Sequence, residues 1–414
     1  MIPPHVWRKL KKRWLLFVIF AVFCLYIFQN LLWQTQVADR ERGREIGVVR
    51  TGQIKDFNNV QGEKSFENKE NFEKQIALPS GVDTNSNSKL GVDARLRAKY
   101  GSARIVLQPE KHGPGYSECP NWFHNSFEDN LAVIANYSIG HAKPYLEKLG
   151  AYQKEPNTTL DFPVFVTAAN SGFFDVTQAL LKSVHEIIMP KYKDMKLIYY
   201  DLGLQDAEVK RLKKYCKCEV RKFPFEDFPG HVQQLKTYAW KPIIIMKLLM
   251  EFGFVWWMDS SVRWTTDKLE ESLNYCKANS ILFFTYDKVL SVAQHMDTQT
   301  MKYFGEDPCK FRYFGETEAT FGAYHFDEVS QTLVRSWAAC ALNENCMAPP
   351  GTASKLSCSI HRTEDGRCHR FDQAVLSLML RRLYHEQNDY PQVPVPINLR
   401  VIERGHRISY FPND

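Results

Sequence analysis

The sequence has little net charge once a short N-terminal cluster is set aside. It contains 53 Lys+Arg and 47 Asp+Glu, and five of the cations (Arg8, Lys9, Lys11, Lys12 and Arg13) precede the first acidic residue. The rest of the chain is close to neutral. A nucleic-acid-binding protein would spread or stripe positive charge over its folded part. The composition therefore excludes a basic nucleic-acid binder.

No G-x-G-x-x-G motif occurs anywhere in the chain. A Rossmann-type methyltransferase needs a glycine-rich turn after its first strand. The segment VTAANSGFFDV, which would fill that position, contains the single glycine Gly172. A methyltransferase is therefore the least favoured of the functions considered below.

Residues 14–33 contain no charged side chain and have tryptophan at both ends. At about 1.5 Å per residue, such a helix crosses the ~30 Å hydrocarbon layer of a bilayer. A cleaved signal peptide is the alternative, but no small-x-small cleavage site follows the apolar run. The pattern predicts a cytoplasmic tail (residues 1–13), a signal anchor in the lipid bilayer, and a lumenal body.

Residues 34–118 contain no tryptophan and no cysteine, and their polar runs predict a flexible stem. A small helical subdomain around residues 91–106 is the alternative. Nine of the ten cysteines lie between Cys119 and Cys368, which predicts disulfides and, because nine is odd, at least one thiol that is free or paired between chains. Sequons at Asn136 and Asn157 agree with a lumenal body.

From residue 119 onward the chain alternates between apolar runs and amphipathic stretches, which predicts one lumenal domain over residues 119–414. The predicted strands are 163–168, 196–201, 218–223, 254–258 and 281–285. The predicted helices are 175–188, 206–215, 235–252 and one that ends near residue 278 after a capping box of Asp267 and Glu270. This alternation indicates an α/β, Rossmann-like, mostly parallel sheet with helices on both faces.

Ligands of such sheets bind beyond the carboxyl ends of the strands. The most specific motif there is FVWWMDSSVRW, in which a buried strand ends at Asp259. A carboxylate in this position can hold a divalent ion that binds a diphosphate, or it can cap its own turn. Lys241 and Lys236 precede this strand by about a helix length, and Lys241 could meet a phosphate as a point charge.

The segments VFVTAANSGFFDVTQALLKSVHE, KLIYYDLGL and YAWKPIIIMKLLMEFGFVWWMDSSVRW resemble the nucleotide-binding half of GT-A glycosyltransferases, distantly those of the glycogenin and galactinol synthase type. YAWKP, WWMDSS and HRFDQ are similar to an animal family of type II membrane proteins. The resemblance implies a nucleotide-sugar half at 163–290 and an acceptor half at 291–414. It also implies donor-binding residues: Thr167, Ala168, Asn170, Asp201, Lys241, Asp259, Ser261 and Arg263.

For the acceptor side, the resemblance points to Glu318, Asp372 and Gln373, with His325 as a further candidate. An acid at the mouth of a helix can act as a base toward a sugar hydroxyl, or it can simply cap the helix. His325 could equally be a buried, hydrogen-bonded histidine. The cluster of Cys340, Cys346, Cys358, His361, Cys368 and His369 matches no standard zinc site, so two disulfides are the preferred interpretation.

Manganese is the ion that the resemblance implies, with Asp259 and His369 as ligands. The sequence departs from Asp-x-Asp, however, because Ser261 replaces the second carboxylate. Three alternatives follow: Asp259 with later ligands holds the ion, the enzyme works without metal, or activity has been lost. We expect a Golgi glycosyltransferase that moves a hexose from a UDP-sugar to a glycan or glycoprotein hydroxyl. An inactive lumenal binding protein is the alternative.

Overall fold

In the computed structural model, the described residues form one compact unit. The described residues are 119, 123–124, 126–137, 140–285, 291–312, 314–355, 358, 364–385 and 399–412. The predicted tail, anchor and stem (residues 1–118) lie outside these ranges. Within them, no helix combines the length and apolar character that a membrane crossing needs.

A six-stranded sheet forms the centre of this unit, in the order β3-β2-β1-β4-β7-β6. Strands β3, β2, β1 and β4 are parallel, and β7 runs antiparallel to both of its neighbours. The predicted α/β class with a mostly parallel sheet is thus confirmed. The strands are β1 Val164–Ala169, β2 Leu197–Asp201, β3 Glu219–Lys222, β4 Phe254–Met258, β6 Ile281–Thr285 and β7 Thr317–His325.

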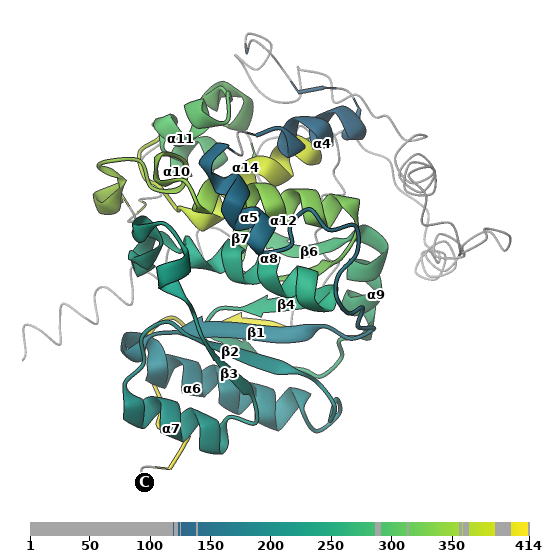
Figure 1. Cartoon of the computed structure of the whole chain (residues 1–414), viewed down its shortest axis with the longest axis vertical. Coiled ribbons are helices and arrows are strands. Elements are labelled where there is room, and N and C mark those ends of the chain that lie inside the picture. The colour runs from purple at the N-terminus through teal and green to yellow at the C-terminus, as the bar shows by residue number, and fades with distance from the viewer. Residues whose placement is uncertain are drawn as a thin grey trace, which may run out of the picture. The chain divides into compact units, whose positions relative to one another are not determined.

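Helices cover both faces of the sheet, as Figure 1 shows. Alternate residues of β1 point to opposite faces, so Val164 and Val166 share one core with α8, α12 and α14, while Phe165 shares the other with α6, α7 and α9. The helices are α4 Phe127–Ala135, α5 Lys143–Lys148, α6 Phe174–Ser183, α7 Asp206–Tyr215, α8 Trp240–Phe252, α9 Glu270–Asn279, α10 Val292–His295, α11 Thr298–Tyr303, α12 Glu328–Ala341, α13 Glu344–Met347 and α14 Asp372–Leu383.

Two predicted helices differ from the structure at their ends. The helix predicted to begin at residue 235 begins at Trp240, because residues 235–237 form a 3-10 turn and Tyr238 has a left-handed backbone. The predicted capping box of α9 is wrong. The N-cap is Leu269, and Asp267 contributes only its backbone carbonyl, which accepts from the Leu269 N–H at 3.0 Å.

The strand order places a topological switch beside β1. The chain builds β2 and β3 on one side of β1 and then crosses to place β4 on the other side. Helices that leave adjacent strands on opposite sides open a crevice beyond the carboxyl ends of those strands. The ends of β1 and β4 are Ala169 and Met258. Asn170 and Asp259 therefore flank this crevice.

Four disulfides are present among the described residues: Cys119–Cys309, Cys216–Cys218, Cys340–Cys346 and Cys358–Cys368. The last two confirm the disulfide interpretation of the C-terminal cysteine cluster over the zinc interpretation. Cys276 is a free, buried thiol, as the odd number of cysteines requires.

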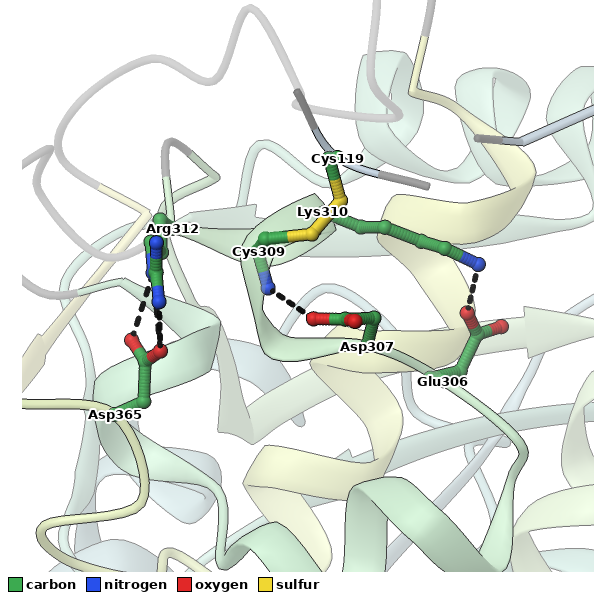
Figure 2. The surroundings of a disulfide bond; sticks show 7 residues. All are labelled: Cys119, Glu306, Asp307, Cys309, Lys310, Arg312 and Asp365. Atoms are coloured by element: carbon green, nitrogen blue, oxygen red, sulfur yellow. Dashed lines mark hydrogen bonds and ion pairs between the residues drawn. A yellow bond between two sulfur atoms is a disulfide. The ribbon is translucent and has the colours of Figure 1, made fainter. Parts of the chain in front are cut away.

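Cys119–Cys309 joins the first described residue to a turn nearly two hundred positions away (Figure 2). Local contacts hold the turn in place: the Cys309 N–H donates to Asp307 Oδ1 at 3.0 Å, and Lys310 Nζ donates to Glu306 at 2.9 Å. Such a link reduces the entropy of the unfolded chain by an amount that grows with the logarithm of the number of residues in the closed loop.

We predict that removing Cys119–Cys309 destabilises the protein more than removing Cys216–Cys218. The sequence separations are 190 and 2, so only the first pair closes a long loop. Replacing both cysteines of the long-range pair by alanine should lower the free energy of unfolding by about 2–5 kcal/mol. Urea unfolding of the two double variants makes the comparison, and an equal loss in both would contradict it.

Candidate active site

Asp259 follows β4 directly and turns the chain toward β5 (Val262–Trp264). Strand β4 is buried along its whole length, so the first polar side chain after it emerges at the edge of the sheet. The Asp259 N–H donates to Thr320 O of β7 at 2.8 Å, and the Trp257 indole N–H donates to Asp259 Oδ1 at 2.7 Å. The Asp259 side chain is 27% exposed. It is therefore held firmly while remaining open to the crevice.

Lys241, in the first turn of α8, joins Asp259 to a second carboxylate. Its ammonium group lies 3.0 Å from Asp259 Oδ1, 2.7 Å from Asp372 Oδ2 and 3.2 Å from the carbonyl oxygen of Ala319. The side chain is 3% exposed. The contact with Ala319 O is a hydrogen bond, and the two carboxylates form ion pairs with the ammonium. Lys241 is therefore directed at protein acceptors, and its predicted contact with a donor phosphate stays a prediction.

Asp372 is the first residue of α14, and the backbone before it is unusual. Phe371 has φ 46°, a left-handed conformation that a bulky side chain rarely adopts. The Asp372 carbonyl accepts from the Trp337 indole N–H at 3.0 Å, which ties α14 to α12. Burial raises the pKa of Asp372 to about 6, although Lys241 acts in the opposite direction. A carboxyl that changes protonation this near neutrality suits proton transfer.

The electrostatic balance around Lys241 keeps it charged. Burial alone would lower the pKa of Lys241, but Asp259 and Asp372 together raise it above its ordinary value. Its ammonium also lies 5.3 Å from the centre of the Tyr238 ring and 5.5 Å from that of Trp257. At such distances an aromatic face attracts a cation. Residues of the motifs YAWKP and WWMDSS thus meet at one ion-paired centre.

Gln373 extends this centre into a buried polar group. Its side-chain amide donates to Glu316 Oε2 at 2.9 Å, and His295 Nδ1 lies 2.6 Å from the same oxygen. Glu318, two residues further along the chain, pairs with Arg400 of β8 (Arg400–Ile402). Three of the residues predicted on the acceptor side therefore lie at or beside the centre, and each has a polar partner.

The predicted donor residues at the ends of β1 and β2 lie at the same edge of the sheet. Thr167 and Ala168 are buried within β1, and Asn170 follows it. Asp201 ends β2, and its Oδ1 accepts the N–H groups of Gly203 and Leu204, both at 2.7 Å. Asp201 therefore stabilises its own turn, the role that a strand-end carboxylate commonly has.

Arg263 and Ser261 anchor the end of the chain. The Arg263 guanidinium donates to Ser260 O at 2.7 Å, Val262 O at 2.8 Å and His406 O at 3.2 Å. The Ser261 carbonyl accepts from the Glu403 N–H at 2.8 Å. Arg263 therefore fixes the turn after Asp259 through backbone carbonyls, and its predicted contact with the donor stays a prediction.

The two histidine candidates lie elsewhere. His369 Nδ1 accepts from the Asp297 N–H at 3.2 Å, and its Nε2 lies 2.9 Å from Met347 O. Burial lowers its pKa to about 4, so the ring is neutral and both nitrogens are occupied. A metal ligand at His369 would have to break one of these bonds. His325 pairs with Phe254, at the opposite edge of the sheet from Asp259.

The segment 399–412, which the sequence-based predictions missed, passes the edge of the sheet at which β1 ends. It pairs with β5 through β8, and Arg407 then donates to Gly172 O at 3.0 Å, just beyond β1. Further along, the N–H groups of Tyr410 and Phe411 both donate to Gln178 Oε1 of α6 at 2.9 Å. The available signal was the basic run Arg404-Gly-His-Arg407, whose three charged or titratable side chains are exposed.

We predict that Asp372 titrates with a midpoint near pH 6. Its pKa is higher in the folded protein than its ordinary value of 3.8, so the folded state binds this proton more tightly. The free energy of unfolding, relative to Asp372→Asn, should therefore fall by about 3 kcal/mol as the pH rises through this window. Carbon-13 NMR of aspartate carboxyls gives the midpoint directly, and a value below 4 would refute the prediction.

Comparisons with known proteins bear on this region. A family model described as "Protein of unknown function (DUF1647)" matches residues 147–246, the stretch from the end of α5 through β1–β3 into the first half of α8. No curated protein matches the sequence.

Solved structures similar to this chain include several glycosyltransferases, at low sequence identity and low TM-score. The bifunctional glycosyltransferase WbbM has 14% identity and a TM-score of 0.32 over 47% of this chain and 38% of its own. Galactosyltransferase LgtC, solved with donor and acceptor sugar analogues, has 13% identity and a TM-score of 0.27 over 42% of this chain and 59% of its own. The Mn/GDP form of core-mannan synthase A from Aspergillus fumigatus has 10% identity and a TM-score of 0.31 over 56% of this chain and 73% of its own. The match thus spans less than two thirds of the first two proteins.

Proposed function

We propose that the protein is a glycosyltransferase that moves a sugar, a hexose, from a UDP-linked nucleotide sugar to a hydroxyl of a glycan or glycoprotein. One observation carries the proposal: Asp259 lies at the switch in strand order and is joined through Lys241 to Asp372. The crevice beyond such a switch is where α/β sheets bind ligands. The resemblance of YAWKP, WWMDSS and HRFDQ to glycosyltransferase-like proteins gives the reaction class.

The donor nucleotide sugar would bind between the ends of β1 and β4. Asn170 and Asp259 flank this crevice, and the segment 404–407 passes close to the end of β1. The exposed guanidinium groups of Arg404 and Arg407 would provide cationic contacts for the diphosphate, since one guanidinium can bind two phosphate oxygens at once.

Asp372 would act on the acceptor hydroxyl. With a pKa of about 6 it is largely ionised near neutral pH, so it can take up a proton. Gln373 would hold the acceptor through the amide that it presents beside Glu316. Glu318, whose charge is met by Arg400, would shape the same side of the site.

A divalent ion does not fit the residues around Asp259. Asp259 Oδ1 already accepts from the Trp257 indole and forms an ion pair with the Lys241 ammonium, and Asp372 pairs with the same ammonium. His369 has both ring nitrogens in hydrogen bonds elsewhere. We therefore assign no catalytic step to manganese.

We also propose that the domain works in the lumen of the secretory pathway, in the Golgi, as a type II membrane protein. Four disulfides in the described residues suit an oxidising compartment. The sequon residues Asn136 and Asn157 are both exposed, so both side chains are accessible to glycosylation.

The decisive experiment is a thermal shift screen of the full chain against nucleotide sugars and S-adenosylmethionine. A ligand at a hundred times its dissociation constant should add about 2.7 kcal/mol to the stability. We expect a UDP-sugar to stabilise the wild type and Asp259→Ala to abolish both this shift and sugar transfer. Asp227→Ala, at an exposed carboxylate outside the site, is the control that should keep both.

The other outcomes assign the alternatives. A shift with S-adenosylmethionine alone would indicate a methyltransferase. Binding of a UDP-sugar without hydrolysis or transfer would indicate an inactive lumenal binding protein. Full activity in Asp259→Ala would refute the assignment of this site.

A second variant tests the role of the C-terminal cations. Arg407→Ala should weaken UDP binding by about 1 kcal/mol, and the loss should shrink as salt is added, because exposed charges are screened. Arg312→Ala, which removes an exposed arginine paired with Asp365, is the matched control. Isothermal titration with UDP at two salt concentrations gives the values, and equal losses in both variants would exclude a specific contact by Arg407.

A further inference from the structure

The position between Asp259 and Asp372 is already filled by a cation that belongs to the protein. Carboxylates placed to share one positive charge are what a divalent ion requires. Here the shared charge is the Lys241 ammonium, 3.0 Å from one carboxylate and 2.7 Å from the other. A metal ion close to both carboxylates would have to displace or approach this ammonium, against the repulsion between like charges.

The ammonium is fixed as well as buried. It donates a hydrogen bond to the carbonyl oxygen of Ala319 in β7. Together with Asp259 at the end of β4 and Asp372 at the start of α14, this contact holds the ammonium from three separate elements. Its side chain is 3% exposed, and the two aromatic rings of Tyr238 and Trp257 lie within 5.5 Å. A lysine that merely covered a surface carboxylate would have a mobile, solvated end.

Asp259 is the more exposed of the two carboxylates in this group. Its side chain is 27% exposed, against 5% for Asp372. Lys241 and Trp257 both contact Oδ1, so Oδ2 is the oxygen that we assign to a ligand as a hydrogen-bond acceptor. An oriented carboxylate oxygen beside a switch in strand order suits a ribose or sugar hydroxyl, which needs an acceptor and no metal.

We propose that Lys241 takes the place of a divalent ion in this site, so that ligand binding is independent of metal and Asp259 accepts a hydroxyl of the ligand. Lys241 is then a positioning residue: it touches no substrate and acts by orienting Asp259 and Asp372. The identity of the ligand as a nucleotide sugar rests on the proposed function, whereas the exclusion of metal does not.

Manganese alone is the probe, with electron paramagnetic resonance of the full chain as the readout. The wild type should bind no Mn²⁺ at this site. Lys241→Met keeps most of the unbranched side chain but removes its charged end, and should gain one Mn²⁺ site. Lys241→Met combined with Asp259→Asn should lose that site again. Circular dichroism confirms that each variant is folded.

Wild-type Mn²⁺ binding that Asp259→Asn removes would overturn the proposal, and so would a folded Lys241→Met variant that binds none. If Lys241→Met does not fold, wild-type affinity for UDP-glucose in EDTA and in MnCl₂ decides. Equal affinities support the proposal, and a loss of about tenfold or more in EDTA overturns it. Absence of nucleotide binding in every condition would refute the proposed function alone, because the Mn²⁺ titrations need no nucleotide.

Discussion

The buried ion pairs of Lys241 connect the elements on which the site depends. The ammonium binds the end of β4 through Asp259, the start of α14 through Asp372, and β7 through the Ala319 carbonyl. Removing a charge from water is costly, and the cost is recovered only where the partners are close and complete. Loss of one partner would leave an uncompensated charge in the core, at about 3–5 kcal/mol. The same ion pairs therefore stabilise the packing of these elements and fix the geometry of the candidate site.

Much of the sheet could be predicted from sequence because its strands are short apolar runs between turn residues. Helix α7 and strand β4 coincide with their predictions, since both have clear periodicity and clear ends. The start of α8 was missed because a left-handed residue, Tyr238, interrupts an otherwise helical pattern. Strand β7 and its antiparallel direction depend on contacts with β4 and β6, which no local pattern specifies.

Part of the candidate site was predictable because its residues lie at the ends of elements that the sequence indicates clearly. Asp259, Lys241 and Asp372 each stand at the end of a recognisable element, so each could be named from its own segment. The Lys241–Asp372 ion pair joins residues more than a hundred positions apart, and only the fold creates it. The sequence could not tell whether Lys241 meets a ligand or two carboxylates. It also could not show that Arg263 binds backbone carbonyls.

The path of the segment 399–412 has a consequence for biosynthesis. Arg407 reaches Gly172 from 235 positions along the chain, and β8 completes the small sheet that begins with β5. During translation the central sheet can form before either contact exists. A chain released early would therefore carry a nearly complete fold without the exposed cations at the crevice. Such a product would keep the central sheet but lack β8 and the contact of Arg407 with Gly172.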